Sequence, residues 1–210
     1  MNKYIVTTTI NKPTLALKKY SKMKDWKLIV VLDKKTPKFS LNNAIILTCK
    51  DQEKISKKLS NLIGWNCIQR RNFGLLWAHD MGADIIAVVD DDNIPYENWG
   101  DNLLVGKESK IKTYDPEINV FDPIGATNYK HLWHRGFPIQ YLQKRSYKKN
   151  FEKVINPDIQ ADFWNGDPDI DAICRMEHSP ECNFDSSCFP FATTKIAPFN
   201  SQNTFLSKKC

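Results

Sequence analysis

The chain has 210 residues, of which 41% are hydrophobic and 26% are charged, the composition of an ordinary folded domain. These values exclude a disordered chain, and eight glycines and 11 prolines without a period exclude a collagen-like chain. The longest apolar runs fall far short of the roughly 18 residues of a membrane-spanning helix, so no transmembrane segment is expected.

Basic residues exceed acidic ones, giving a net charge of 30 − 24 = +6. Five basic residues are arginines, so 30 − 5 = 25 are lysines, spread along the chain rather than gathered in a dense stripe. This spread argues against a nucleic-acid surface. The first ten residues lack the apolar core of a signal peptide. We therefore expect a cytoplasmic protein whose six cysteines are thiols.

One group of soft metal ligands needs an interpretation: Cys174, His178, Cys182 and Cys188. Four such residues can form a zinc site. The segment has no CxxC pair and is interrupted by Asp, Ser and Pro, so buried or idle thiols are the alternative. A Cys182–Cys188 disulfide is expected only if the protein is exported.

Four segments rich in β-branched or aliphatic residues predict strands, at 4–10, 28–32, 44–47 and 85–89. Helices are predicted between them from the spacing of apolar residues. The first begins at Pro13 with Leu15, Leu17, Tyr20 and Met23 turned inward. The next follows a capping box at Thr48 and Asp51, with Ile55, Leu59, Leu62 and Ile63 inward. The last spans about 72–81, with Phe73, Leu76 and Trp77 inward and Gly82 as its stop.

This order of elements predicts an α/β fold, a Rossmann-type, mostly parallel sheet flanked by helices. Past residue 100 the pattern loosens into short strands, prolines and aromatic loops. We therefore expect a single domain over 1–210, with a regular half at 1–100 and a looser half at 101–210.

Three successive carboxylates, Asp90, Asp91 and Asp92, follow the buried strand predicted at 85–89. Like charges this close repel one another, and a hard divalent cation relieves the repulsion. Mg²⁺ typically takes one or two protein carboxylates and completes its shell with water and phosphate oxygens. Ligands of open α/β sheets also bind beyond the carboxyl ends of strands. The triplet predicts a metal site for a diphosphate; an acidic turn capping a following helix is the alternative.

The triplet lies in the segment Ala-Asp-Ile-Ile-Ala-Val-Val-Asp-Asp-Asp-Asn at 83–93, preceded by Arg-Asn-Phe-Gly at 71–74. This pattern resembles GT-A type nucleotide-diphospho-sugar transferases. It is more closely similar to the STELLO-type glycosyltransferases, and more distantly to the plant reversibly glycosylated polypeptides, which act as UDP-arabinopyranose mutases. Further similar segments lie at 30–37, 134–138, 166–173 and 198–205. They occur in the order of the family and span nearly the whole chain.

The resemblance implies a GT-A fold, with a nucleotide-binding half at 1–100 and an acceptor-side half at 101–210. It implies Mn²⁺ or Mg²⁺ as cofactor and a UDP-sugar as donor. The DxD-like signature maps onto Asp90, Asp91 and Asp92. Asp90 and Asp92 are the expected metal ligands, and Asp90 and Asp91 the expected nucleotide contacts, with Asp92 favoured for the metal and Asp90 for the ribose.

Further nucleotide contacts are implied near the ends of the first strands. Thr8 and Thr9 end the first strand, where the resemblance places base and ribose, although a threonine run is also ordinary strand filler. Asp33 ends the second strand, where a carboxylate commonly reads the uracil N–H. Arg71 is placed to reach the nucleotide or diphosphate. Its alternative is a surface arginine paired with Asp80 or Asp84.

The second half offers the candidate acceptor-side groups. Arg135 matches the residue type that becomes glycosylated in the plant family; self-glycosylation, a phosphate clamp and a structural turn stay open for it. His134 is either a base or a packing group. Asp167, Asp169 and Asp171 are candidate general bases or sugar ligands, with turn and helix-cap duties as the alternative. The neutral polar segment 200–203 suits sugar hydroxyls.

Together these features predict a metal-dependent glycosyltransferase that moves a sugar from a UDP donor to an unknown glycan, protein or small-molecule acceptor. The alternatives are a nucleotide-sugar mutase, and a non-catalytic nucleotide-sugar-binding scaffold that modulates a partner glycosyltransferase. Related chains continue past the segment matching 198–205. Either this enzyme is minimal, or a carboxyl-terminal part of its active site is missing.

Overall fold

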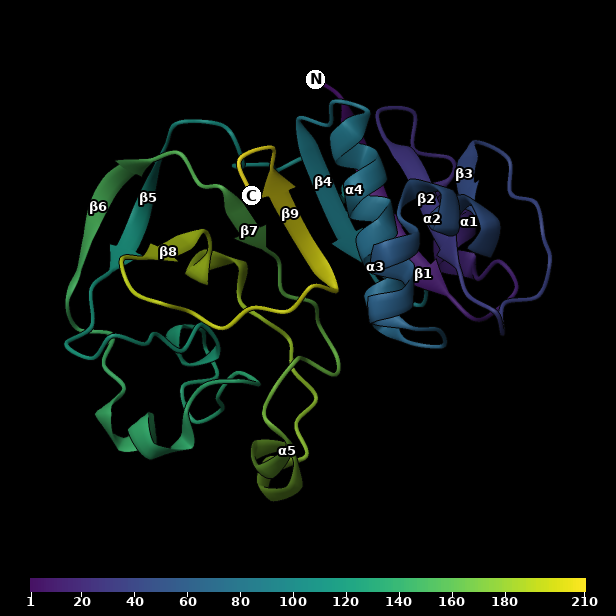
Figure 1. Ribbon diagram of the computed structural model, residues 1–210. Coiled ribbons are helices and arrows are strands. Elements are labelled where there is room, and N and C mark those ends of the chain that lie inside the picture. Colours follow the sequence, from purple (N-terminus) through teal and green to yellow (C-terminus); the bar gives the residue numbers. More distant parts are fainter. The chain divides into compact units, whose positions relative to one another are not determined.

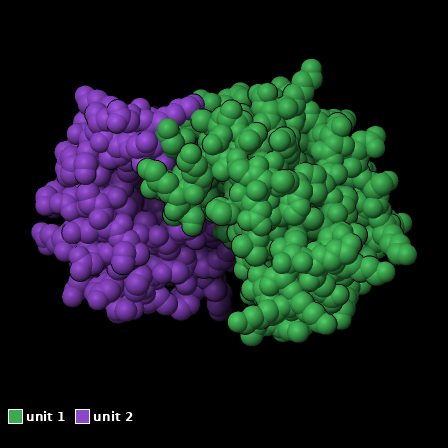
Figure 2. All heavy atoms as spheres, turned by 45° about the horizontal axis from the view of Figure 1, so that its top comes forward, with its two compact units in different colours: residues 1–106, 158–160, 201–210 green, residues 107–157, 161–200 purple.

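The computed structural model describes all 210 residues, which form two compact units (Figure 2). Unit 1 comprises residues 1–106, 158–160 and 201–210, and unit 2 comprises 107–157 and 161–200. Each unit has its own hydrophobic core. None of the helices is both long and apolar enough to cross a membrane.

Unit 1 is built on a six-stranded sheet whose strand order is β3-β2-β1-β4-β9-β7 (Figure 1). The first four of these strands are parallel, and β9 joins β4 antiparallel. The mostly parallel sheet with flanking helices confirms the predicted α/β fold. The strands are β1 (Lys3–Thr9), β2 (Lys27–Leu32), β3 (Ala44–Leu47), β4 (Ile85–Val89), β7 (Ile159–Ala161) and β9 (Asn203–Ser207).

Helices cover both faces of this sheet because β1, β2 and β4 are apolar on both sides. One face packs on α1 (Leu15–Tyr20) through buried Leu17 and Tyr20. The other packs on α2 (Cys49–Ile55), α3 (Lys57–Ile63) and α4 (Asn72–Asp80). Helix α4 lies so close that a Cβ on Gly74 would stand 2.5 Å from Val6 Cγ1, so only glycine fits there.

The predicted helix boundaries are largely confirmed, including the capping box of Thr48 and Asp51 and the stop at Gly82, whose φ is +71°. The prediction of one helix carrying Ile55, Leu59, Leu62 and Ile63 is wrong, because this segment forms two helices. Ser56 takes an extended conformation and caps a second helix, so the chain turns between α2 and α3. Leu62 of α3 is 74% exposed. Two other residues predicted to face inward are also exposed, Leu15 of α1 at 57% and Leu76 of α4 at 39%.

Unit 2 contains a three-stranded sheet of order β6-β5-β8. Its elements are β5 (Ser109–Tyr114), β6 (Asn150–Ile155), β8 (Phe191–Thr193) and α5 (Ala172–His178). A cluster around Ile124, Leu132 and Phe137 forms its core, with Cys174 and Cys182 inside it. All six cysteines are free thiols, and no three His, Cys, Asp or Glu side chains gather as a metal site. The cysteine–histidine segment is therefore not a preformed zinc centre.

Candidate functional site

The candidate site lies at the carboxyl edge of the unit 1 sheet. Strands β1, β2 and β4 are parallel, so their ends at Thr9, Leu32 and Val89 share that edge. Strand β1 lies between β2 and β4, and the chain passes from β1 to β2 on one side and reaches β4 on the other. This is the topological switch point at which open α/β sheets bind ligands.

Asp90 directly follows β4 and is held by two side chains. Arg71 Nη1 donates to its Oδ1 at 2.9 Å, and Gln202 Nε2 donates to its Oδ2 at 2.7 Å. Arg71 also donates from Nη2 to Ser201 Oγ at 2.6 Å. The arginine is nearly buried, and the alternative of a surface pair with Asp80 or Asp84 is wrong. Three segments far apart in sequence thus meet around one carboxylate.

The polar segment 201–203 reaches this site because β9 begins at Asn203, which pairs with Val89. Two further hydrogen bonds fix it there. Asn93 Nδ2 donates to the carbonyl of Gln202 at 3.1 Å, and Trp99 Nε1 donates to Asn203 Oδ1 at 2.8 Å. The segment proposed from sequence for sugar hydroxyls therefore also frames the acidic triplet.

Asp91 ties the triplet to the end of β1. Its Oδ2 accepts hydrogen bonds from Thr9 Oγ1 and, at 3.2 Å, from Asn11 Nδ2. The hydroxyl of Thr14, which caps α1, donates to the Asp91 carbonyl. No helix follows the triplet, so its interpretation as a cap for the next helix is wrong. Asn11 and Thr14 were not identified from sequence, because only the fold brings their short loop beside β4.

Asp92 is exposed, and the hydrogen bonds and the ion pair of the triplet are made by Asp90 and Asp91. Asp91 Oδ1 is without a protein partner. These are hard oxygen donors, and a Mg²⁺ or Mn²⁺ ion that shares its shell with phosphate and water needs only one or two of them. The residues therefore fit such an ion, although the protein alone assembles no three-ligand group. Asp90 fits less well, because both of its oxygens are engaged.

Asp33 lies at the end of β2 and is buried. Its Oδ1 accepts the backbone N–H of Lys34 at 2.6 Å, and its Oδ2 accepts that of Cys67 at 3.2 Å. Each carboxylate oxygen keeps the capacity for a second hydrogen bond. Thr8 is partly buried and donates to the Val31 carbonyl at 2.8 Å, a bond that serves the sheet.

Arg70 is a buried cation that sequence reasoning missed. It stacks on Trp65, with Cζ 3.7 Å from the ring centroid, and its Nε donates to Gln52 Oε1 at 2.7 Å. Burial lowers the pKa of this guanidinium, which the nearby charge of Asp33 opposes. Its Nη2 has no hydrogen-bond partner. The only hint in the sequence is that two of the five arginines stand side by side.

In unit 2, the three carboxylates proposed as bases each have a different partner. Asp167 forms an ion pair with Arg175. Asp171 caps α5, accepting the N–H of Ile173 at 2.9 Å. Asp169 is buried; its Oδ1 pairs with Arg135 Nε at 2.9 Å, while its Oδ2 is buried without a partner.

His134 and Asp122 lie at the centre of unit 2. The imidazole is buried, and its Nδ1 lies 2.5 Å from the Arg135 carbonyl, which places the proton of the neutral ring on Nδ1. Burial lowers the pKa of His134. Asp122 accepts the backbone N–H of His134 at 3.0 Å and pairs with Arg145 Nη1 at 2.7 Å. This network packs the unit rather than presenting a base to solvent.

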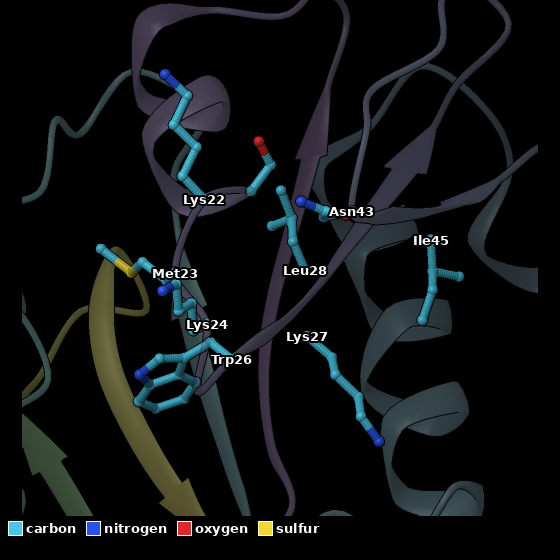
Figure 3. Close-up of a pocket in the computed structure, with 9 residues that line it drawn as sticks. Lys22, Met23, Lys24, Trp26, Lys27, Leu28, Asn43 and Ile45 are labelled. Atoms are coloured by element: carbon cyan, nitrogen blue, oxygen red, sulfur yellow. The ribbon is translucent and has the colours of Figure 1, made fainter.

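A separate hollow of about 330 Å³ opens at the other end of the unit 1 sheet, where β2 begins (Figure 3). It is lined by Ser21, Lys22, Met23, Lys24, Trp26, Lys27, Leu28, Asn43 and Ile45. Figure 3 shows the side chains of Lys22 and Lys27 extending in opposite directions. No carboxylate lines this hollow, and its Lys22 and Lys27 side chains do not converge. The carboxyl edge therefore remains the candidate site.

Comparison with known proteins gives two distant plant relatives, and no protein-family model matches the chain. The chain is 27% identical over 222 residues to "Probable glycosyltransferase STELLO1" from Arabidopsis thaliana, covering 96% of the chain and 29% of that protein. It is 26% identical over 184 residues to "Probable glycosyltransferase STELLO2" from the same plant, covering 81% of the chain and 24% of that protein. The chain thus spans less than a third of these relatives. At this level of identity it is similar to proteins named as glycosyltransferases.

Proposed function

We propose that this chain is a glycosyltransferase that binds the nucleoside diphosphate of a sugar donor, with UDP as the expected nucleotide, at the carboxyl edge of the unit 1 sheet. The observation that carries the proposal is the convergence of Arg71, Asp90–Asp92 and residues 201–202 at the switch point between β1 and β4. The similarity to two proteins named as glycosyltransferases supports it.

Arg71 is the proposed diphosphate ligand. Its planar guanidinium bridges Asp90 and Ser201 through two different nitrogens, the fork geometry that also suits phosphate oxygens. The arginine is therefore already oriented, and a phosphate can replace one of its two partners. Asp90 then acts as the group that holds Arg71 at the sheet edge.

Asp92, with the free oxygen of Asp91, is the proposed holder of Mn²⁺ or Mg²⁺. When bound, such an ion supplies charge neutralisation for the departing diphosphate. Use of Asp90 as a second metal ligand requires an oxygen that already accepts a hydrogen bond from Arg71 or Gln202 to bind the ion through its second lone pair. Asp33 is the proposed reader of the base, and the hydroxyls of Thr8 and Thr9 mainly hold the surrounding strands and loops.

In unit 2, Asp169 is the strongest of the three candidate bases. Asp167 is committed to Arg175 and Asp171 to a helix cap, whereas Asp169 keeps one oxygen without a partner. That oxygen is buried, so it must become exposed before it can take a proton from an acceptor. Arg135 binds the other oxygen through Nε alone, so its terminal nitrogens stay available to a ligand. We assign Arg135 the role of orienting Asp169.

The binding proposal is tested by titrating the protein with UDP in the presence and absence of Mn²⁺. UDP at 100 times its dissociation constant should stabilise the fold by about 2.7 kcal/mol, a readily measured thermal shift. Asp92→Asn should remove the Mn²⁺-dependent part of this shift while leaving the unliganded protein as stable as before. Asp25→Asn, an exposed aspartate at the other end of the sheet, is the matched control. If Asp92→Asn keeps the same Mn²⁺-dependent thermal shift with UDP, the site assignment is wrong.

The transferase activity is tested separately by incubating the protein with a library of UDP-sugars and measuring release of UDP. Release of UDP with transfer or hydrolysis of the sugar supports a transferase. A rearranged sugar still attached to UDP indicates a mutase. Binding without turnover of any donor indicates a non-catalytic nucleotide-sugar-binding module and overturns the enzymatic proposal.

A further inference from the structure

Strand β6 forms an open edge of the unit 2 sheet (Figure 1). It pairs only with β5, and five of its six residues are exposed, on both faces of the strand. Two of them are large and apolar: Phe151 is 42% exposed and Val154 is 62% exposed. An exposed edge of this kind is a ready template for another strand.

The register of β5 and β6 shows which backbone groups point to the open edge. The N–H of Asp115 donates to the Lys149 carbonyl at 3.0 Å, beside the pair of Tyr114 and Asn150. Hydrogen-bonded pairs alternate along an antiparallel ladder, so residues 151, 153 and 155 bond to β5. The N–H and C=O groups of Asn150, Glu152 and Val154 therefore point outward.

A second copy of the chain is a poor partner for this edge. Two copies of β6 related by a two-fold axis must pair around a single residue, because outward-pointing groups have to meet. The two registers that overlap the strand most fully centre on Glu152 or on Lys153. Either one sets a charged side chain directly opposite its own copy, which destabilises the pairing.

The charge around the edge favours an acidic partner. Residues 107–114 and 147–155 contain six lysines and two glutamates, a balance of 6 − 2 = +4. Glu152 stands opposite Lys112 in the register, and Lys149 is paired with Asp115. Lys110, Lys148 and Lys153 have no acidic partner within 4.0 Å and are exposed.

We propose that β6 docks an extended acidic peptide segment of another protein, which adds a fourth strand to the sheet of unit 2.

The test uses a fluorescein-labelled peptide of alternating Glu and Val residues, with a Lys and Val peptide as the opposite-charge probe. Binding of the acidic peptide is measured by fluorescence anisotropy, and we expect it to weaken as salt is raised. Amide hydrogen exchange gives the second readout. The amides of Glu152 and Val154 should exchange fast in the free protein and become protected with peptide bound. Those of Phe151 and Lys153 should be protected in both states.

Val154→Pro removes one outward-pointing donor and leaves the bonds to β5 intact, so it should weaken acidic-peptide binding at least tenfold without changing thermal stability. Lys153→Gln needs no backbone change and should weaken binding severalfold, whereas Lys22→Gln in unit 1 should not. Equal binding of both peptides, or no effect of either β6 variant, overturns the proposal. The proposal is also overturned if the protein forms a homodimer that Val154→Pro dissociates, because the edge of β6 would then bind a second copy of the chain.

Discussion

Asp90 with Arg71 in unit 1 and Asp122 with Arg145 in unit 2 are the same chemical pair in two settings. Asp122 is completely buried, and its oxygens accept two backbone N–H groups, the arginine and, at 3.5 Å, the hydroxyl of Tyr147. Asp90 retains 24% side-chain exposure, and both of its partners are side chains.

This contrast distinguishes an ion pair that maintains the fold from one that can take part in ligand binding. A buried carboxylate saturated by backbone donors cannot exchange a partner without leaving charge unpaired in the core. A partly exposed carboxylate held by side chains at a sheet edge can exchange one of them for a ligand or water at a lower cost, because water can solvate the charge. Asp122 therefore belongs to the fold of unit 2, and Asp90 to the site proposed in unit 1.

The largest expected effect is on stability. Asp122→Asn should lower the free energy of unfolding by about 3–5 kcal/mol, because it leaves Arg145 without its counter-charge in a buried network. Asp90→Asn should cost less, about 1–3 kcal/mol, because Asp90 is 24% exposed and water can replace part of its interaction with Arg71. Urea denaturation of both variants measures the difference. Equal losses would show that the two pairs play the same role.

The next effect is on nucleotide binding. Arg71→Lys should weaken UDP binding about tenfold, because one ammonium cannot reproduce a planar fork that contacts Asp90, Ser201 and phosphate. This corresponds to about 1.4 kcal/mol. Arg175→Lys, in the exposed pair with Asp167, is the matched control and should bind UDP normally. Isothermal titration calorimetry measures both, and a normal affinity for Arg71→Lys would remove the arginine from the site.

A smaller effect concerns acid stability. His134 is buried with a lowered pKa, whereas in the unfolded chain the imidazole takes up a proton near pH 6.5. The unfolded state thus binds more protons, so the free energy of unfolding should fall as pH drops below about 6.5 through the folded pKa. His134→Gln should flatten this part of the profile, and the exposed His79→Gln should not. If the stability of His134→Gln depends on pH as steeply as that of the wild type, the titrating group is a different residue.

The smallest effect is expected for Ser201, which accepts a hydrogen bond from Arg71. Ser201→Ala removes one hydrogen bond at the partly exposed sheet edge and should cost about 1 kcal/mol or less. Thermal denaturation measures this loss. A loss as large as that of Asp122→Asn would mean that the segment 201–203 is as structural as the core of unit 2.

Local sequence signals predicted most of unit 1. Continuous apolar runs gave β2 and β4, and the capping box placed the start of α2, because these signals act between residues a few positions apart. Leu62 shows where this reasoning fails. Its spacing fits a helical stripe, but the turn at Ser56 reorients the second helix and leaves the side chain in solvent.

The acidic triplet was recognisable as carboxylates after an expected strand, Arg71 as a basic residue at an expected helix start, and the segment 200–203 as a neutral polar loop. That Asp90 would be shared by Arg71 and Gln202 was not, since these residues are separated from it by 19 and 112 positions. Likewise, Asp169 differs from Asp167 and Asp171 in the burial and the partners that the fold gives it.

Local sequence patterns were thus sufficient for strands β1 to β4, for most of the helices around them, and for the position of three carboxylates after a buried strand. Hydrophobic periodicity and capping fix these features over short distances. Which carboxylate has all its hydrogen bonds satisfied, which is shared between two side chains and which has no protein partner depends on the assembled fold. Those outcomes depend on contacts between distant segments, and strand pairing such as that of β4 with β9 creates them only when the whole unit is assembled.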